Sequence, residues 1–168
     1  FPWLYLDYNT LQNAAIARVY GIQAGVDLKL LSGFGLYSRI NIQKGEEELD
    51  NGTISPSRHA APWFGISKLT YTQKKLNLEF YAQYSGGKKF NELPEGEKSK
   101  DYIYAIDENG NPYSPSWVTL NFKAMYQFAK NFIISGGVEN ITNERYKTYS
   151  SGLVAPGRNF ILSLNAKF

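Results

Sequence analysis

The stretch that decides the fold is the last eleven residues of the chain, RNFILSLNAKF, Arg158 to Phe168. Apolar and polar side chains alternate along it, and only Ile161 breaks the alternation. The apolar positions are Phe160, Leu162, Leu164, Ala166 and Phe168. A period of two predicts a β-strand with one apolar and one polar face. The chain stops on an aromatic residue without a polar tail, which favours the closing strand of a barrel over a strand of a soluble sandwich.

Six stretches before it carry a comparable pattern, so the sequence predicts seven strands. They cover residues 14–30, 34–43, 62–72, 76–84, 118–128, 132–140 and 158–168. In most of them apolar side chains occupy one face, and polar or charged side chains occupy the other. The phase of the third strand stays open, because its apolar residues fall on both faces: Phe64, Ile66, Leu69 and Tyr71.

The connections between these strands differ in length in a regular way. The breaks after the first, third and fifth strands are short, whereas those after the second, fourth and sixth are long and polar, at residues 45–61, 85–115 and 141–157. We expect an irregular loop in the first of these and a small hairpin around Tyr102 to Ile106 in the second. Short periplasmic turns and long extracellular loops are typical of outer-membrane barrels. The predicted fold class is therefore all-β, an antiparallel transmembrane β-barrel segment of about seven strands.

The composition supports strands and excludes several other classes. The 168 residues include 13 Tyr, 10 Phe and 15 Gly, which favours strands joined by turns. The absence of Cys excludes a disulfide framework and a thiolate metal site. A scattered net charge of +3 gives no basic stripe, so we expect no nucleic-acid partner. Because no run of about 18 apolar residues is present, any crossing of a membrane would be made by strands.

Catalysis finds no support in the sequence. We find no nucleophile motif near His59, no Gly-rich phosphate loop and no paired-carboxylate site. His59 is the only histidine and has no paired ligand, which weakens haem or metal ligation. We therefore expect neither an enzyme nor a resident metal or cofactor. The chain begins at Phe1 without the pattern of a signal peptide, so we expect this start to be a cut or a processing site.

The segment from Gly137 to Phe168 resembles the carboxy-terminal end of TonB-dependent outer-membrane receptors. In that family a V-x-N-[aliphatic] unit is followed by an R/K-Y pair and then by a G-R-x-[aromatic] strand that finishes on Phe. The matching residues here are Val138, Asn140, Ile141, Arg145, Tyr146, Gly157, Arg158 and Phe160. Upstream, ARVYGIQAGVDLKL (17–30) and RHAAPWFG (58–65) are similar to a strand and to a loop-to-strand entry of the family. The resemblance covers nearly the whole chain and is weakest over 85–115.

The resemblance implies a 22-stranded barrel in the bacterial outer membrane, with an amino-terminal plug and a TonB box. Residues 1–168 would be the carboxy-terminal portion of that barrel, without the plug and the earlier strands. The implied activity is import of a scarce ligand, a ferric siderophore above all, with energy supplied by TonB through the absent amino-terminal part. The implied partners also include outer-membrane lipid and the outer-membrane assembly machinery. The signal that this machinery reads would be carried by Phe160, Leu162, Leu164 and Phe168.

Six residues are candidate contacts to such a ligand, because cationic and aromatic groups suit an anionic, catecholate-bearing chelate. Tyr37, Arg39 and Tyr81 would lie on the inner wall, and Arg58, His59 and Trp63 at the mouth. Six aromatic residues on the outward face would form an interfacial girdle. They are Tyr20, Phe34, Tyr71, Phe128, Phe132 and Phe168.

Other interpretations remain open from the sequence. A haem or carbohydrate receptor of the same family is one, although the FRAP-type and NPNL-type motifs of haem receptors are missing. A passive porin or an adhesin is another. A soluble barrel that binds a small apolar ligand is a third, and it predicts that Leu28, Phe80 and Leu164 point inward.

Overall fold

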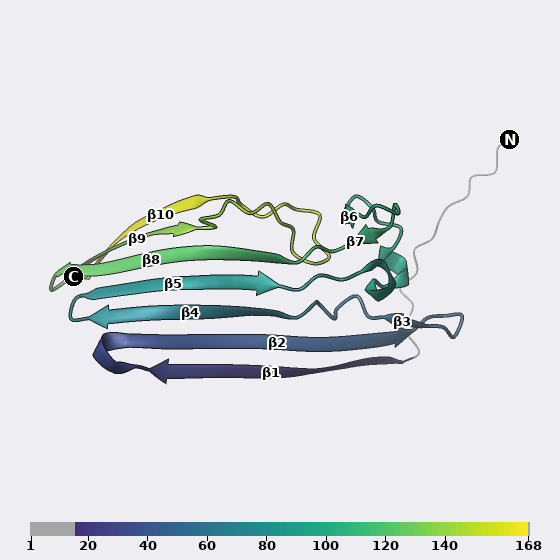
Figure 1. Ribbon diagram of the computed structural model, residues 1–168, viewed down its shortest axis with the longest axis horizontal. Helices are drawn as coiled ribbons and strands as arrows, with labels where there is room; N and C mark the ends of the chain where they lie inside the picture. Colours follow the sequence, from purple (N-terminus) through teal and green to yellow (C-terminus); the bar gives the residue numbers. More distant parts are fainter. Residues whose placement is uncertain (1–15, 168) are drawn as a thin grey trace.

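In the computed structural model, which describes residues 16–167, seven long strands form one antiparallel sheet (Figure 1). Their order is β1-β2-β4-β5-β8-β9-β10, so each long strand pairs with the next one along the chain. The strands are β1 (Ala17–Lys29), β2 (Phe34–Glu48), β4 (Phe64–Gln73), β5 (Leu76–Ser85), β8 (Trp117–Ala129), β9 (Phe132–Glu139) and β10 (Asn159–Ala166). The prediction of an all-β fold with seven antiparallel strands is confirmed.

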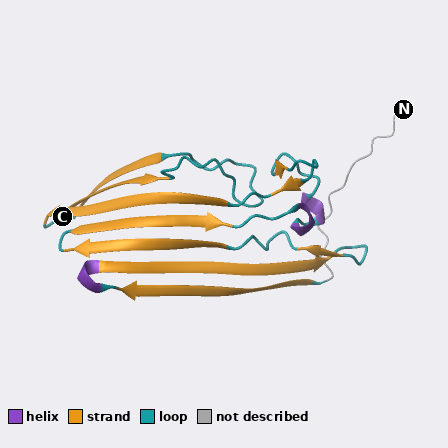
Figure 2. Cartoon of the chain, in the orientation of Figure 1, coloured by secondary structure: helices purple, strands orange, loops and turns teal. Residues whose placement is uncertain are grey.

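Short turns join the strands at one end of the sheet, and long connections gather at the other end (Figure 2). A 3-10 turn, Leu31–Gly33, joins β1 to β2, and Gly33 has a φ of +84°. A Cβ atom at this position would collide with the carbonyl oxygen of Thr72, so the turn requires glycine. Only Lys74 and Lys75 separate β4 from β5, and only Lys130 and Asn131 separate β8 from β9. The predicted difference between the two ends of the sheet is confirmed.

The register gathers the apolar side chains on one face of the sheet. Leu69 lies opposite Phe80, which in turn lies opposite Phe122. This face is exposed: Leu28 and Phe80 are each 45% accessible, and Leu164 is 64% accessible. In the part of the chain that the structure describes, no helix and no second layer of strands covers it. The soluble-barrel interpretation requires these side chains inside, whereas the structure leaves them exposed.

The open phase of the third predicted strand, β4, is settled by its partners. Leu69 lies opposite Leu36, and Lys68 lies opposite Tyr37. The odd-numbered residues of β4 therefore share the apolar face. Phe64 and Ile66 lie on the polar face, since side chains alternate along a strand.

The prediction of an irregular loop from residue 45 is wrong at its start. Strand β2 continues to Glu48 and pairs with a short strand, β3 (Ile54–Pro56). Asn51 and Gly52 make the turn between them. The Oδ1 atom of Asn51 accepts hydrogen bonds from the backbone N (3.0 Å) and the hydroxyl (2.6 Å) of Thr53, and Gly52 has a φ of +77°. An Asn-Gly pair strongly favours a hairpin. Here the hairpin extends the sheet beyond the residues in which apolar and polar side chains alternate.

The small hairpin expected around Tyr102 to Ile106 lies slightly further along the chain. Its strands are β6 (Ala105–Ile106) and β7 (Pro112–Tyr113). Asp107 holds the turn, because its Oδ1 atom accepts the backbone amides of Asn109 (2.9 Å) and Asn111 (2.8 Å). Among residues 16–167, no helix is long and apolar enough to cross a membrane.

Aromatic side chains lie at both ends of the apolar face. At the short-turn end, the ring of Phe34 lies 4.8 Å from that of Tyr71, and the ring of Phe128 lies 5.7 Å from that of Phe132. Phe168, another predicted girdle residue, lies outside the described residues. At the loop end, Trp63 lies 6.0 Å from Tyr84. Tyr20, opposite Lys44, also lies at the loop end. Eight positions separate Trp63 from Tyr71, or about 26 Å along a strand at about 3.3 Å per residue.

Candidate functional site

A row of polar side chains crosses the face opposite the apolar one. Five residues on five neighbouring strands follow each other as direct cross-strand partners, namely Asp27, Tyr37, Lys68, Tyr81 and Asn121. Because direct partners share a face, this row places charged, aromatic and amide groups side by side. Arg39, two positions after Tyr37, and Glu79, two positions before Tyr81, lie on the same face.

Cations in this row lie over aromatic rings. The guanidinium carbon of Arg39 is 5.1 Å from the ring centre of Tyr37, and the ammonium of Lys68 is 5.3 Å from that of Tyr81. Lys68 also lies 3.7 Å from a carboxylate oxygen of Glu79. We call Tyr37, Arg39, Lys68, Glu79 and Tyr81 together the polar wall. It combines aromatic surface with two cations and one acid, a combination that suits an anionic aromatic ligand.

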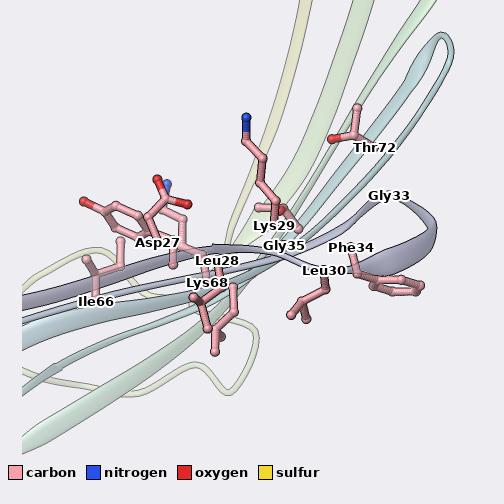
Figure 3. Close-up of a pocket in the computed structure, with 13 residues that line it drawn as sticks. Asp27, Leu28, Lys29, Leu30, Gly33, Phe34, Gly35, Ile66, Lys68 and Thr72 are labelled. Atoms are coloured by element: carbon pink, nitrogen blue, oxygen red, sulfur yellow. The ribbon is translucent and has the colours of Figure 1, made fainter.

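A broad hollow lies near the short turns. It has a volume of about 790 Å³ and is lined by residues of β1, β2 and β4 (Figure 3). In this view Lys29 and Thr72 point to one side of the sheet, whereas Leu30 and Phe34 point to the other. The lining thus comes from both sides of the sheet, and it includes Tyr37 and Lys68 of the polar wall.

Three loops meet at the other end of the sheet, and we call them together the loop cap. They are residues 49–63, 86–116 and 140–158, the first, second and third loops. Lys88 of the second loop donates a hydrogen bond to the carbonyl oxygen of Ala60 in the first loop at 2.5 Å. Lys147 of the third loop donates to the carbonyl oxygens of Tyr102 (3.2 Å) and Ile103 (3.3 Å) in the second. The loops are thus fastened to each other.

Glu97 is the centre of this cap. Its side chain is 1% exposed, and it receives contacts from all three loops. Arg58 Nε lies 3.0 Å from its carboxylate, and Lys100 Nζ donates to it at 2.7 Å. The hydroxyls of Tyr104 (2.8 Å) and Ser150 (3.4 Å) donate to the other oxygen. A buried carboxylate is therefore fully surrounded by donors, as burial of a charge requires.

These contacts alter the acidity of the groups around Glu97. Burial by itself would raise the pKa of Glu97, but the hydrogen bonds from Lys100 and Tyr104 and the charge of Arg58 outweigh it, so the pKa lies below its ordinary value. Burial, together with the charge of Glu97, raises the pKa of Tyr149 to about 12. Glu97 is therefore ionised and Tyr149 is neutral at physiological pH.

The third loop is anchored by residues of the carboxy-terminal motif. Asn140 has a φ of +50° and is buried, and its amide nitrogen donates to the carbonyl oxygens of Glu144 (2.8 Å) and Pro156 (3.1 Å). Its Oδ1 atom accepts the backbone amide of Glu144 at 2.8 Å. Arg158 Nε donates to the carbonyl oxygen of Ile141 at 3.0 Å. The motif residues thus close the base of the loop.

This loop lies on the polar face of β8. The ring of Tyr146 stacks on that of Trp117, with centres 4.2 Å apart. Next to them, Thr119 and Asn121 are buried, and Asn121 Oδ1 accepts the backbone amide of Asn140 at 2.9 Å. A cavity of about 310 Å³ remains between the second and third loops, lined in part by Tyr104, Trp117 and Tyr146.

The structure divides the six candidate ligand contacts into separate places. Tyr37, Arg39 and Tyr81 lie together in the polar wall. Arg58 lies in the loop cap, bound to Glu97, and the neighbouring His59 is exposed. Trp63 packs against Tyr84, whose cross-strand partner Gly65 belongs to the apolar face. Trp63 is therefore turned away from the polar wall.

Two important residues were not among the candidates. Lys68 lies on β4, and its face became clear only from the partners of that strand. Glu97 lies in a segment rich in charged residues, where no local pattern distinguishes it from Glu92 or Glu95. Within residues 16–167, no group of three or more His, Cys, Asp or Glu side chains is arranged to hold a metal ion.

Comparison with known proteins gives the fold and geometry a context. A family model described as TonB dependent receptor-like, beta-barrel matches residues 3–141. Hemoglobin-binding protein A of Haemophilus influenzae is 26% identical over 200 aligned residues, which cover 97% of this chain and 19% of that protein.

Two solved structures share the fold. The copper transporter OprC has a TM-score of 0.71 at 16% identity, over 90% of this chain and 23% of that one. The siderophore receptor PiuA from Acinetobacter baumannii has a TM-score of 0.59 at 19% identity, over 90% of this chain and 22% of that one. The chain thus spans about a fifth of the length of the proteins that it matches.

Proposed function

The chain belongs to the TonB-dependent receptor-like β-barrel family, a family of transporters and receptors, and from this premise we propose that residues 1–168 form the carboxy-terminal portion of a 22-stranded outer-membrane barrel. The whole receptor imports a ferric siderophore, with energy supplied by TonB. The plug and the TonB box belong to the part of the receptor before this portion. The exposed apolar face supports contact with lipid, since an unpartnered apolar surface of this size is costly in water.

The observation that carries the siderophore proposal is the polar wall. Tyr37 and Tyr81 offer aromatic surface, and Arg39 and Lys68 lie over these rings as cations. Catecholate and carboxylate groups of a ferric chelate bring negative charge and planar rings, which both components of the wall attract. In this proposal Arg39, Lys68 and the two tyrosines contact the ligand during its passage, whereas Glu79 orients Lys68.

The remaining candidates receive secondary roles in the proposal. Arg58 and His59 lie at the entrance, where Arg58 shapes the loop cap through Glu97 and His59 is open to an arriving ligand. Trp63 anchors the barrel wall at the outer membrane interface. Phe160, Leu162, Leu164 and Phe168 present the apolar terminal strand to the assembly machinery.

Uptake of an iron-labelled ferric siderophore by a strain that relies on this receptor, with that siderophore as the sole iron source, tests the proposal. We expect the double variant Arg39→Ala, Lys68→Ala to reduce uptake of the iron-labelled chelate by about tenfold or more, because two charge-assisted contacts are lost. The matched control is Lys74→Ala, Lys75→Ala, which removes two cations at the short-turn end. Equal uptake by wild type and the wall variant, at equal receptor levels, would contradict the assigned wall.

The similarity to hemoglobin-binding protein A supports a second candidate, a haem-bearing protein as the iron source. The two candidates differ in where the ligand first binds, because a protein is too large to enter the barrel and has to dock on the loops. Growth on haemoglobin that depends on His59 and survives the wall variant would favour this candidate. Loss of TonB stops growth under either one, whereas a passive porin would not need it.

A further inference from the structure

The buried carboxylate of Glu97 belongs to the loop cap and not to the polar wall, and its contacts indicate a different role. The three loops are far apart in sequence: Arg58, Glu97 and Ser150 are separated by about forty and fifty positions. Arg58 Nε donates a second hydrogen bond to Ser150 Oγ at 3.4 Å, so the first and third loops also touch each other at this point. One carboxylate therefore joins three chain segments that have no covalent reason to meet.

Apolar packing between the loops is too small to replace these contacts. Among the described residues, the buried apolar side chains of the cap are Ala60, Leu93, Tyr104 and three prolines, Pro62, Pro94 and Pro112. Tyr104 is itself bound to Glu97 through its hydroxyl, and its ring lies 6.4 Å from that of Tyr149 in the third loop. The ammonium group of Lys88 lies over the ring of Tyr149, 4.8 Å from its centre. The loops thus meet around a polar centre.

We propose that Glu97 is a positioning residue that fastens the three loops into one body, so that the loop cap opens and closes as a unit at the end of the polar wall. The geometry gives this body a defined inner surface, because the third loop rests on β8 through Tyr146 and Trp117. Loss of the Glu97 charge weakens the contacts of Arg58, Lys100 and Ser150 together, whereas Lys88 and Lys147 keep their own hydrogen bonds between the loops. The fastening is a property of the loops alone, whereas its use as an entrance gate rests on the proposed function.

Hydrogen exchange measured peptide by peptide on the full-length receptor in detergent tests the fastening. In Glu97→Gln we expect backbone amides in all three loops to exchange faster by about tenfold or more. Hydrogen bonds to a charged group contribute enough free energy to shift the opening equilibrium of the loops by such a factor. Strand peptides keep their rates. Glu95→Gln is the matched control, since Glu95 lies two positions away and forms an exposed ion pair with Lys98.

The pattern over the loops decides the outcome. A residue with a local structural role would affect only the second loop, and faster exchange confined to residues 86–116 would overturn the proposal. Ser150→Ala keeps the charge of Glu97 and removes two long hydrogen bonds, one to Glu97 and one from Arg58. It should therefore accelerate exchange in the same three loops by a smaller factor. If Glu97→Gln assembles poorly, this milder variant decides alone: acceleration limited to the third loop would also overturn the proposal.

A second readout separates the fastening from the transport proposal. Binding of a ferric siderophore to the same samples should slow loop exchange in wild type and less so in Glu97→Gln. If no siderophore has any effect while the three loops still respond together to Glu97→Gln, the import proposal fails and the fastening stands. If siderophore uptake is confirmed but the loops respond separately, the fastening fails and the import proposal stands.

Discussion

The sheet and the loop cap are stabilised in opposite ways. In the sheet, regular backbone pairing holds seven strands together while large apolar side chains such as Phe80 and Leu164 stay exposed. In the described residues, the buried apolar side chains all lie in the cap, and its centre is the carboxylate of Glu97. The apolar face of the sheet thus suits the contact with lipid proposed above, and the cap suits water. Each region should fail under a change that the other tolerates.

The largest effect is expected from a charge on the apolar face of the sheet. Ala82 lies opposite Ser67, halfway between the levels of Trp63 and Tyr71. In the proposed outer-membrane barrel, Arg at this position would face the middle of the membrane, so Ala82→Arg should lower the free energy of unfolding by about 2–4 kcal/mol and reduce the amount of assembled receptor. Unfolding by urea in lipid vesicles measures it. Gln83→Arg, on the polar face, is the control and should cost little.

A smaller effect is expected at the base of the cap. Asn140→Ala removes a buried side chain that makes three hydrogen bonds within the third loop, and it leaves the carbonyl oxygens of Glu144 and Pro156 without this donor. We expect a loss of about 1–3 kcal/mol in the stability of this loop and faster proteolysis there, with unchanged unfolding of the strands. Thr142→Ala, an exposed neighbour, is the control. Unfolding of the whole sheet at a lower urea concentration would show that the two regions are not independent.

The regular half of this comparison was predictable from sequence, and the other half was not. The period of two predicts each strand because side-chain alternation is a local property, and Leu162 to Ala166 display it without help from neighbouring strands. The same local rule left β4 open, since Ile66 and Leu69 are both apolar and only the partners on β2 distinguish them. Glu97 has no local signature at all. Its role depends on Arg58 and Ser150, which the fold brings to it from distant positions.

Acid should loosen the cap before it affects the sheet. Because the pKa of Glu97 is lowered in the closed cap, its contribution is fully present above the ordinary carboxylate pKa of about 4.3 and is lost as the pH falls through the lowered value. The cations that face it are Arg58 and Lys100, and the tyrosines that face it, Tyr104 and Tyr149, have raised pKa values and stay neutral throughout this range. Loop exchange, corrected for its intrinsic pH dependence, should therefore stay slow from pH 7 to 5 and accelerate in stronger acid. In Glu97→Gln the corrected rates should be fast and flat; an acid limb that persists there would assign the effect to another group.

The smallest effect is expected within the polar wall, where Lys68 lies over the ring of Tyr81 and also near Glu79. A double-mutant cycle with Lys68→Met and Tyr81→Leu isolates the first of these contacts, and its coupling energy should be about 0.5–1 kcal/mol, as for a partly exposed cation–π pair. The equivalent cycle with Lys75→Met, at the short-turn end, should give none. A wall coupling this weak leaves both groups free to exchange their contact for a ligand, whereas Arg58 is held by a buried carboxylate. A coupling as large as that between Arg58 and Glu97, measured in the same way, would make the wall a second structural centre and would remove Lys68 and Tyr81 from the ligand path.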